Sequence, residues 1–298
     1  MKTKVFCTST GCLEYAPQRY REMGIGIIRV HLFFEGKEYL EGIGLDPVEL
    51  YEKMEKLEDP KSNLPKTAMP TRTEIQAHFD QAIAEGYDEA IVIAISSAMG
   101  GTYNFIRMVA EDYADRIKIT VIDSKITCFG EGLLAVKAQE MVNAGLPTER
   151  IIKEIEWMQA HQEFFGMVGK LDYLIYNGRL TGGKAFFGKM LSICPVIHFT
   201  KDGAISPLCS VRTQKKALHK TCEVLKEILG DRDPKDYLLW HIYTGPSLVK
   251  TLEEIEGEYG ISCNHEPVIM SPVSGCHNGP WLAGYGVLFL RREDEPLE

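Results

Sequence analysis

The sequence predicts an α/β protein with two domains, an N-terminal domain on a parallel sheet and a C-terminal α+β domain with a mixed or antiparallel sheet. At 298 residues the chain is long for a single hydrophobic core. Its first half alternates β-type apolar runs with helical patterns, as parallel sheets with right-handed crossovers do. Its second half has hairpin-like spacing, with Lys201-Asp-Gly203 between two apolar runs.

The first half reads as strand and helix in alternation. Asp46 is expected to cap a helix because a proline and a glutamate follow it, and Thr71-Arg-Thr-Glu74 has the pattern of a capping box. The five apolar residues from Ile91 to Ile95 stop at two serines, which is typical of a strand buried on both faces. We expect strands at 4–7, 26–34, 90–95 and 117–122, and helices starting at 46 and 71 and covering 103–113, 132–143 and 148–161.

The pattern changes near residue 165, so we expect domains at 1–165 and 166–298. An apolar helix after the glycine-rich segment 177–183 could wall a ligand tunnel or pack as ordinary core, and it would run through Phe186, Phe187, Met190 and Leu191. The remaining strands are expected at 165–168, 193–199, 204–208, 237–243, 267–271 and 286–291, and the remaining helices at 212–229 and 246–258.

Composition excludes several classes of function. The net charge of −9 argues against nucleic-acid binding, which needs a basic surface. No stretch approaches the roughly 20 apolar residues of a membrane-spanning helix. Eight cysteines are scattered without a C-x-x-C pair, so their spacing predicts no metal site and favours the reduced thiols of a cytoplasmic protein.

Polar clusters follow three strands of the first half: Thr8-Ser9-Thr10, Ser96-Ser97 and Asp123-Ser124-Lys125. Any one of them could consist of hydroxyls that cap a loop. If the strands are parallel neighbours, however, all three clusters lie on the rim where open α/β sheets bind ligands. The helix start after Gly100-Gly101 adds backbone N–H groups that suit an anion. Together they predict a site for a carboxylate or a phosphate.

A histidine between glycines forms a second candidate, in Ser274-Gly-Cys-His-Asn-Gly-Pro280. Glycines let a backbone approach a ligand closely, although a lone histidine such as His277 is more often structural. Ser97, His277 and Asp123 could form a nucleophilic triad, but the G-x-S-x-G elbow is absent. The P-loop and the dinucleotide-binding G-x-G-x-x-G are absent as well.

Five blocks of the chain, in order, resemble the motifs of the DegV family. Residues Ile95-Ser-Ser-Ala-Met-Gly-Gly-Thr-Tyr103 resemble its I-S-S-x-L-S-G-T-Y signature. The other four blocks are Lys66-Thr-Ala-Met-Pro-Thr71, Val121-Ile-Asp-Ser-Lys125, Asn177-Gly-Arg-Leu180 with Ile193-Cys-Pro195 after it, and Gly275-Cys-His-Asn-Gly-Pro280. The resemblance spans nearly the whole chain.

The resemblance implies a carrier that binds a long-chain fatty acid between two domains and presents its carboxylate to a separate acyl kinase. It implies no catalytic residue, no metal and no cofactor in the carrier itself. By position, the carboxylate would be bound by Thr67, Ser96, Ser97 and His277, with support from Ser9, Gly101, Thr102, Arg179 and Gly275. The protein departs from the family pattern at Thr8, Gly100, Cys194 and Trp281. These departures bear on which fatty-acid chain is preferred and on recognition by a kinase.

Two other functions remain open from the residues. A serine-dependent acyl hydrolase would use Ser97 and His277. A protein that binds a phosphate ligand would use the same strand–turn–helix segment.

Overall fold

The structure is a computed structural model that describes residues 2–58, 60–180, 193–292 and 295. The expected helix through Phe186, Phe187, Met190 and Leu191 lies outside the described residues. Within the described ranges, no helix is long and apolar enough to span a membrane.

The strands form three sheets in the described part of the chain. The first is parallel, has the order β2-β1-β6-β7, and consists of β1 (Thr3–Thr8), β2 (Gly26–Ile28), β6 (Glu89–Ala94) and β7 (Lys118–Asp123). The second has the order β10-β9-β8-β13-β11-β12 and consists of β8 (Gln162–Val168), β9 (Cys194–Phe199), β10 (Ile205–Val211), β11 (Tyr237–Tyr243), β12 (Val268–Ile269) and β13 (Leu282–Phe289). It is mixed, because β11 pairs with β12 in parallel and the other pairs are antiparallel. The predicted fold class is therefore confirmed.

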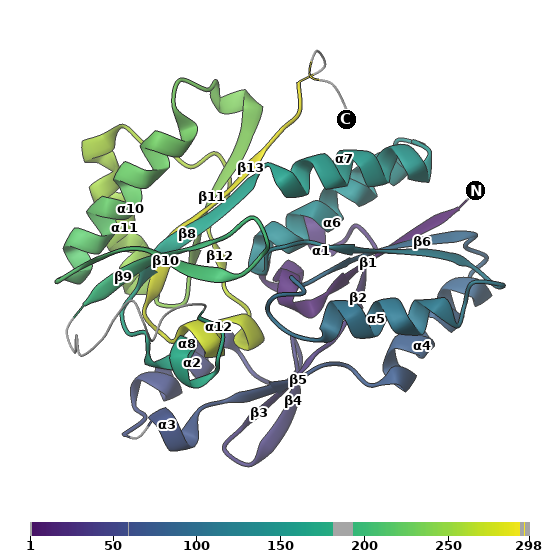
Figure 1. The fold of residues 1–298 in the computed structure, drawn as a ribbon, viewed down its shortest axis with the longest axis horizontal. Helices are drawn as coiled ribbons and strands as arrows, with labels where there is room; N and C mark the ends of the chain where they lie inside the picture. Colours follow the sequence, from purple (N-terminus) through teal and green to yellow (C-terminus); the bar gives the residue numbers. More distant parts are fainter. Residues whose placement is uncertain (1, 59, 181–192, 293–294, 296–298) are drawn as a thin grey trace.

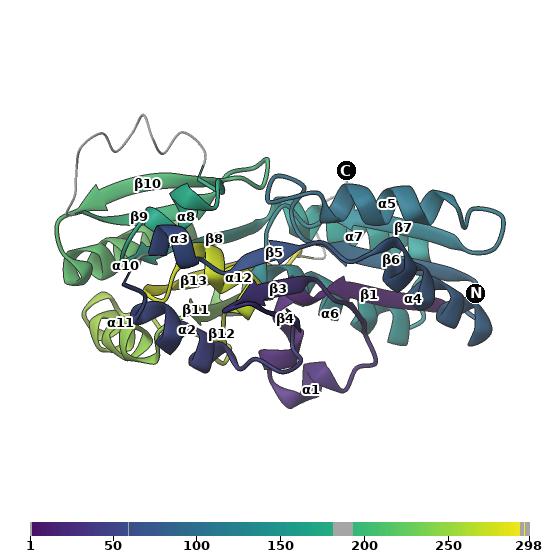
Figure 2. The same ribbon diagram turned by 90° about the horizontal axis from the view of Figure 1, so that it is seen from below.

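A small antiparallel sheet of order β4-β3-β5 was not expected. It consists of β3 (His31–Phe34), β4 (Lys37–Leu40) and β5 (Lys66–Ala68). The apolar run 26–34 reads as one strand, but it divides after Ile28, and its second part leaves the parallel sheet to form a hairpin. The hairpin turns at Glu35 and Gly36, which both have positive φ. Figures 1 and 2 show this small sheet beside the place where the two larger sheets meet.

The helices of the described residues cover the sheets and fill the space between them (Figure 1). They are α1 (Gln18–Arg21), α2 (Pro47–Glu55), α3 (Pro60–Asn63), α4 (Arg72–Ala84), α5 (Thr102–Glu111), α6 (Cys128–Asn143), α7 (Thr148–Ala160), α8 (Asp172–Tyr176), α10 (Gln214–Leu229), α11 (Pro246–Tyr259) and α12 (Pro272–Asn278). Both predicted caps are confirmed. Asp46 accepts hydrogen bonds from the N–H groups of Val48 and Glu49, and Thr71 forms a capping box with Glu74.

Several elements differ from the sequence expectation. α6 starts at Cys128 and not at 132, and β8 starts at Gln162 and not at 165. The sequence analysis assigns no helix around His277, but residues 272–278 form α12, with Ser271 as the N-cap and Pro272 at the first helical position. β13 starts at Leu282, four residues before the strand expected at 286–291, because glycines at 284 and 286 obscure the apolar pattern.

The main hydrophobic core joins the parallel sheet to the mixed sheet. α6 contacts β1, β6 and β13, and its residues Leu133, Leu134, Ala135 and Val136 are fully buried. The same apolar cluster includes side chains of β1, β6, β9 and β13. The domain boundary expected after residue 165 falls inside β8, which pairs with β9 and β13 in the mixed sheet. The division into domains 1–165 and 166–298 stays a prediction.

Candidate functional site

A cavity of about 590 Å³ lies at the carboxyl ends of β1 and β6, where the sequence predicts a ligand site. The end of β5, the start of α5 and one side of α12 complete its wall. Figures 1 and 2 together show α12 and the small sheet beside the place where the two larger sheets meet. The lining residues are Thr10, Val30, Thr67–Thr71, Ile95, Met99–Thr102, Phe105, Thr127, Arg179, Ile205, Val273, Ser274, His277 and Asn278.

Thr67 and His277 meet in this wall although 210 positions separate them in the sequence. Thr67 lies on β5 opposite Leu32 of β3, and His277 lies in the last turn of α12. The Thr67 hydroxyl and His277 Nε2 are 3.1 Å apart and form a hydrogen bond. A hydroxyl has one O–H and a neutral imidazole one N–H, and their mutual hydrogen bond uses one of these protons, so the pair keeps one donor for an anion.

The His277 imidazole is neutral at physiological pH. Burial lowers the pKa of His277 to about 3, and the positive charge of Arg179 lowers it further. The Nδ1 atom of His277 is buried and has no hydrogen-bond partner within the described residues. A buried polar atom without a partner is unfavourable, so a ligand group that pairs with this ring gains free energy. A carboxylate has the charge that Arg179 and a neutral imidazole N–H favour.

The start of α5 faces the same cavity. Gly101 and Thr102 line it at the first turn of this ten-residue helix, where N–H groups and the helix dipole favour an anion. Arg179 also lines the cavity and donates a hydrogen bond to the carbonyl of Asn177. Of the supporting residues proposed from the sequence, Gly101, Thr102 and Arg179 therefore lie in the wall.

Ser96 and Ser97 occupy the turn after β6 but are not among the lining residues. The Ser96 hydroxyl is buried and donates to the carbonyl of Gly203, 2.7 Å away, in the turn between β9 and β10. The backbone N–H of Ser97 donates to Asp123 Oδ1 at 3.1 Å. Both serines thus fix the turn that precedes the cavity residues Met99–Thr102.

The other two supporting residues lie behind the wall. The Ser9 hydroxyl accepts a hydrogen bond from the N–H of Val30, whose side chain lines the cavity. Gly275 lies inside α12, where a Cβ would collide with the ring of Tyr51. The Tyr51 hydroxyl donates to the carbonyls of Met270 and Ser271, so Gly275 allows α2 to pack against α12.

Several polar residues of the wall were not named as carboxylate-binding or supporting residues from the sequence, among them Thr10, Thr127 and Ser274. Thr127 and Ser274 join the start of α6 to α12 through a hydrogen bond of 3.0 Å between their hydroxyls. Thr10 is part of the Thr8-Ser9-Thr10 cluster and Ser274 of the His277 segment. Their positions in those polar segments could have indicated them, but Thr127 carries no comparable signal.

A buried glutamate supports the strand ends below the cavity. Glu131 of α6 accepts hydrogen bonds from the hydroxyls of Thr8 and Thr10, and the Thr8 hydroxyl accepts one from the N–H of Ile95. Burial raises the pKa of Glu131 to about 8, and the negative charge of Asp123 adds to the shift. Thr8, one of the positions at which the chain departs from the DegV pattern, thus lies next to a carboxyl that α6 supplies.

Glu131→Gln is expected to change how stability depends on pH. The folded-state pKa of Glu131 lies near 8 and its ordinary value is 4.5, so the folded state retains a proton in this range that the unfolded state loses. The contribution of Glu131 is complete below pH 4.5 and is lost as pH rises to 8, at up to about 1.4 kcal/mol per pH unit. Urea unfolding at pH 5 and pH 8 should show a smaller decline in Glu131→Gln than in the parent. An equal decline in both proteins contradicts the assignment.

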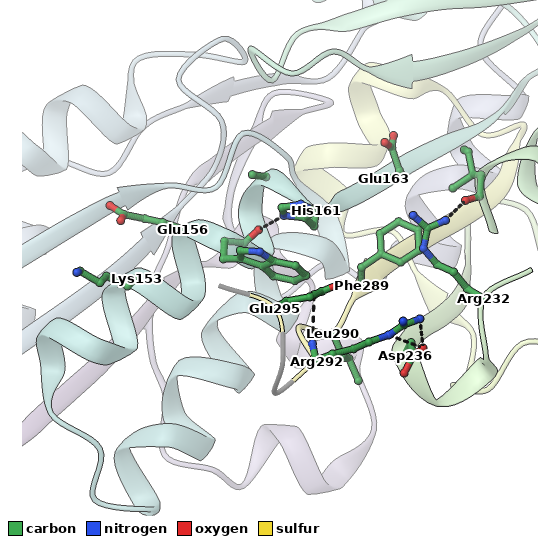
Figure 3. Close-up of a pocket in the computed structure, with 13 residues that line it drawn as sticks. Lys153, Glu156, His161, Glu163, Arg232, Asp236, Phe289, Leu290, Arg292 and Glu295 are labelled. Atoms are coloured by element: carbon green, nitrogen blue, oxygen red, sulfur yellow. Dashed lines mark hydrogen bonds and ion pairs between the residues drawn. The ribbon is translucent and has the colours of Figure 1, made fainter. Parts of the chain in front are cut away.

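A second cavity, of about 810 Å³, lies between α7, the end of β13 and the loop that follows α10 (Figure 3). Most of its lining residues are charged or aromatic. Arg292 forms an ion pair with Asp236 at 2.6 Å, and Arg232 lies over the ring of Phe289. His161 lies against Trp157, and its Nδ1 hydrogen-bonds to the Trp157 carbonyl (Figure 3). The walls of this second cavity carry charged side chains of both signs, and none of the predicted site residues lines it.

The residues of the hypothetical Ser97–His277–Asp123 triad have other partners. Asp123 Oδ1 accepts from the N–H groups of Ser97 and Lys125, and His277 Nε2 pairs with Thr67. Within the described residues no hydrogen bond joins Ser97 to His277. A nucleophile needs its base within hydrogen-bond reach, so this arrangement does not favour a serine hydrolase.

Comparison with known proteins gives a consistent result. The family model described as "Uncharacterised protein, DegV family" matches residues 2–290. The chain is similar to the structure of DegV, described as a fatty acid binding protein, from Bacillus subtilis, with 30% identity, a TM-score of 0.81, and coverage of 97% of this chain and 99% of that one.

Two further structures are similar over nearly their whole length. A fatty acid binding DegV family protein from Streptococcus agalactiae has 26% identity and a TM-score of 0.86, with 98% of this chain and 100% of that chain covered. A stearic acid-binding protein from Eubacterium ventriosum has 27% identity and a TM-score of 0.82, with 96% and 98% covered. With a family model that matches almost end to end, and the predicted sheets and cavity in place, the chain belongs to the DegV family.

Proposed function

We propose that this chain binds a long-chain fatty acid in the 590 Å³ cavity, with the carboxylate at Thr67 and His277. The observation that carries the proposal is the Thr67–His277 pair, which places a neutral hydrogen-bond donor in the same cavity wall as Arg179 and the first turn of α5. Relatives described as fatty-acid-binding proteins support the same ligand.

The acyl chain would contact the apolar part of the cavity wall. A methylene contributes about 0.8 kcal/mol when it is buried, so a 16-carbon chain supplies roughly 10 kcal/mol before the cost of ordering. With that contribution from the acyl chain, one hydrogen bond from the Thr67–His277 pair, together with the positive charge of Arg179, suffices to hold the carboxylate. The apolar lining residues are Val30, Ala68, Met69, Pro70, Ile95, Met99, Phe105, Ile205 and Val273.

The carboxylate would be held by direct and indirect contacts. The Thr67–His277 pair donates the one proton that its own hydrogen bond leaves free, and Gly101, Thr102 and Arg179 surround the carboxylate with N–H groups and positive charge. Ser96 and Ser97 belong to the proposed site through the turn that they hold in place. Ser9 and Gly275 support the wall from behind.

We further propose that the chain is a carrier, not itself the catalyst, which presents the carboxylate to a separate acyl kinase in the cytoplasm. The resemblance to the DegV motifs is the basis for the kinase. Gly100 and Gly101 are exposed beside the head-group residues, so a partner could approach the carboxylate from that side. All eight cysteines are free thiols, which agrees with a reducing compartment.

Titration of delipidated protein with three ligands tests the proposal. Calorimetry should show tight binding of a 16- or 18-carbon fatty acid and weaker binding of the matching fatty alcohol, which lacks the charge that Arg179 and α5 favour. A short polar phosphate ester such as glycerol phosphate should not bind measurably, because it buries no acyl chain. Binding of the phosphate ester without binding of the fatty acid would refute the proposal in favour of a phosphate site.

A further inference from the structure

A cluster of potential metal ligands lies where α11 packs against the mixed sheet, among residues that do not line the fatty-acid cavity. It brings together His241 of β11, Glu256 of α11 and Cys263 of the loop after α11, whose ligand atoms all lie within 4.8 Å of one another. His241 and Glu256 are buried and Cys263 is half-buried. Glu256 follows His241 by 15 positions, and Cys263 follows Glu256 by 7. For this reason the sequence shows no ligand spacing typical of a metal site.

The distances between the donor atoms approach those of a tetrahedral site. Cys263 Sγ lies 3.5 Å from His241 Nε2 and 4.0 Å from Glu256 Oε1. Ordinary zinc bond lengths place a sulfur and a nitrogen ligand about 3.5 Å apart. His241 Nε2 and Glu256 Oε1 are 2.6 Å apart, so the carboxylate would have to move by under about 1 Å to admit an ion.

The residues around these three groups suit a cation. Glu253 Oε1 lies 3.9 Å from His241 Nδ1, which is buried and has no hydrogen-bond partner in the described part of the chain. A metal on Nε2 leaves the ring proton on Nδ1, where a carboxylate stabilises it, as in many zinc sites. Tyr285, which pairs with His241 across the β11–β13 ladder, donates a hydrogen bond of 2.7 Å to Glu256.

The same surroundings do not suit a nucleophilic cysteine. The Glu256 carboxylate lies 4.0 Å from Cys263 Sγ, and the Glu253 carboxylate lies beside the same cluster. A reactive cysteine needs neighbours that stabilise the thiolate, and here the neighbours oppose it. A divalent cation reverses that balance, because it neutralises the carboxylates and binds the thiolate directly.

We propose that His241, Glu256 and Cys263 bind a divalent transition-metal ion of the zinc class. Three protein ligands leave one position for water or for a further side chain. On binding, N–Zn, O–Zn and S–Zn bonds form in place of the hydrogen bond between His241 and Glu256, and the ring proton moves from Nε2 to Nδ1. The six-coordinate aqua ion keeps one water and releases five, and the Cys263 thiol releases its proton to the buffer. The half-buried Cys263 and the partly exposed Glu253 mark the side from which the ion enters.

Zinc binding by the full chain tests this proposal. The protein is stripped with a chelator in the presence of a reductant, and Zn²⁺ alone is titrated in competition with a chromophoric chelator. We expect one Zn²⁺ per chain and the release of at least one proton per ion. Co²⁺ in place of Zn²⁺ should give a thiolate-to-cobalt charge-transfer band. Absence of stoichiometric zinc binding would overturn the proposal.

Variants separate the site from adventitious binding. Cys263→Ser should weaken zinc binding by more than about tenfold and abolish the charge-transfer band, and Glu253→Gln should weaken it by about tenfold. Cys209→Ser is the matched control, since this half-buried thiol on β10 lies outside the cluster. Circular dichroism establishes that each variant is folded. Equal zinc affinity in Cys263→Ser and Cys209→Ser contradicts the assignment.

Discussion

Thr67→Val should weaken the binding of a long-chain fatty acid by about 1.5–3 kcal/mol, or roughly 10- to 150-fold. Valine keeps the shape of threonine but removes the hydroxyl that pairs with His277 in the cavity wall. A carboxylate that depends on this donor would lose a charge-assisted hydrogen bond. Calorimetric titration of delipidated protein measures the change.

Thr67→Ser is the control, because it retains the hydroxyl and should bind within about threefold of the parent. If Thr67→Val bound the fatty acid as tightly as the parent, Thr67 would not belong to the head-group site. Ser97→Ala is the companion test. A loss similar to that of Thr67→Val places the Ser97 hydroxyl in direct contact with the carboxylate, and an unchanged affinity limits Ser97 to holding the turn.

Gly203→Ala should lower the free energy of unfolding by about 2–4 kcal/mol, which is large for the addition of one methyl group. Gly203 has a φ of +78°, where a side chain is strained. A Cβ there would collide with Ser96 Oγ and lie 2.8 Å from the Lys125 Cα. The turn between β9 and β10 packs against the end of β6 at this point, and Ile205 of β10 lines the cavity.

Gly145→Ala separates the two causes. Gly145 has a φ of +76°, but a Cβ there would meet no atom within 4 Å. It should therefore show only the backbone cost, about 1–2 kcal/mol. Urea unfolding of the two variants measures both effects, and Gly203→Ala should also weaken fatty-acid binding. Equal destabilisation by the two substitutions would show that the contact with Ser96 and Lys125 is not tight.

Local signals in the sequence account for much of the fold. The apolar run before Ser96 predicts β6, and the Thr71 capping box predicts the start of α4, because both depend on residues close in sequence. The small sheet was missed because residues 26–34 form one apolar run, and only packing decides that β3 leaves the parallel sheet. α12 was missed because glycines within 274–279 outweigh its Ser271-Pro272 start in a pattern analysis.

The sequence predicts where the candidate site lies, but not which of its side chains contact one another. The rule that ligands bind at the carboxyl ends of parallel strands locates the cavity. Spacing cannot pair Thr67 with His277, since that pairing depends on how α12 docks beside β5. Nor can it indicate that the Ser96 hydroxyl points to Gly203, away from the cavity wall. The His241–Glu256–Cys263 cluster was likewise invisible, because strand pairing and helix packing bring its members together.

Native mass spectrometry of the freshly purified protein, followed by lipid extraction, tests the central claim most directly. An apolar cavity of about 590 Å³ in a cell that contains free fatty acids should be filled. The account predicts one bound species per chain whose mass equals that of a long-chain fatty acid, and its release on extraction. Folded protein that carries no acyl chain, and that acquires none when incubated with fatty acid, would contradict it.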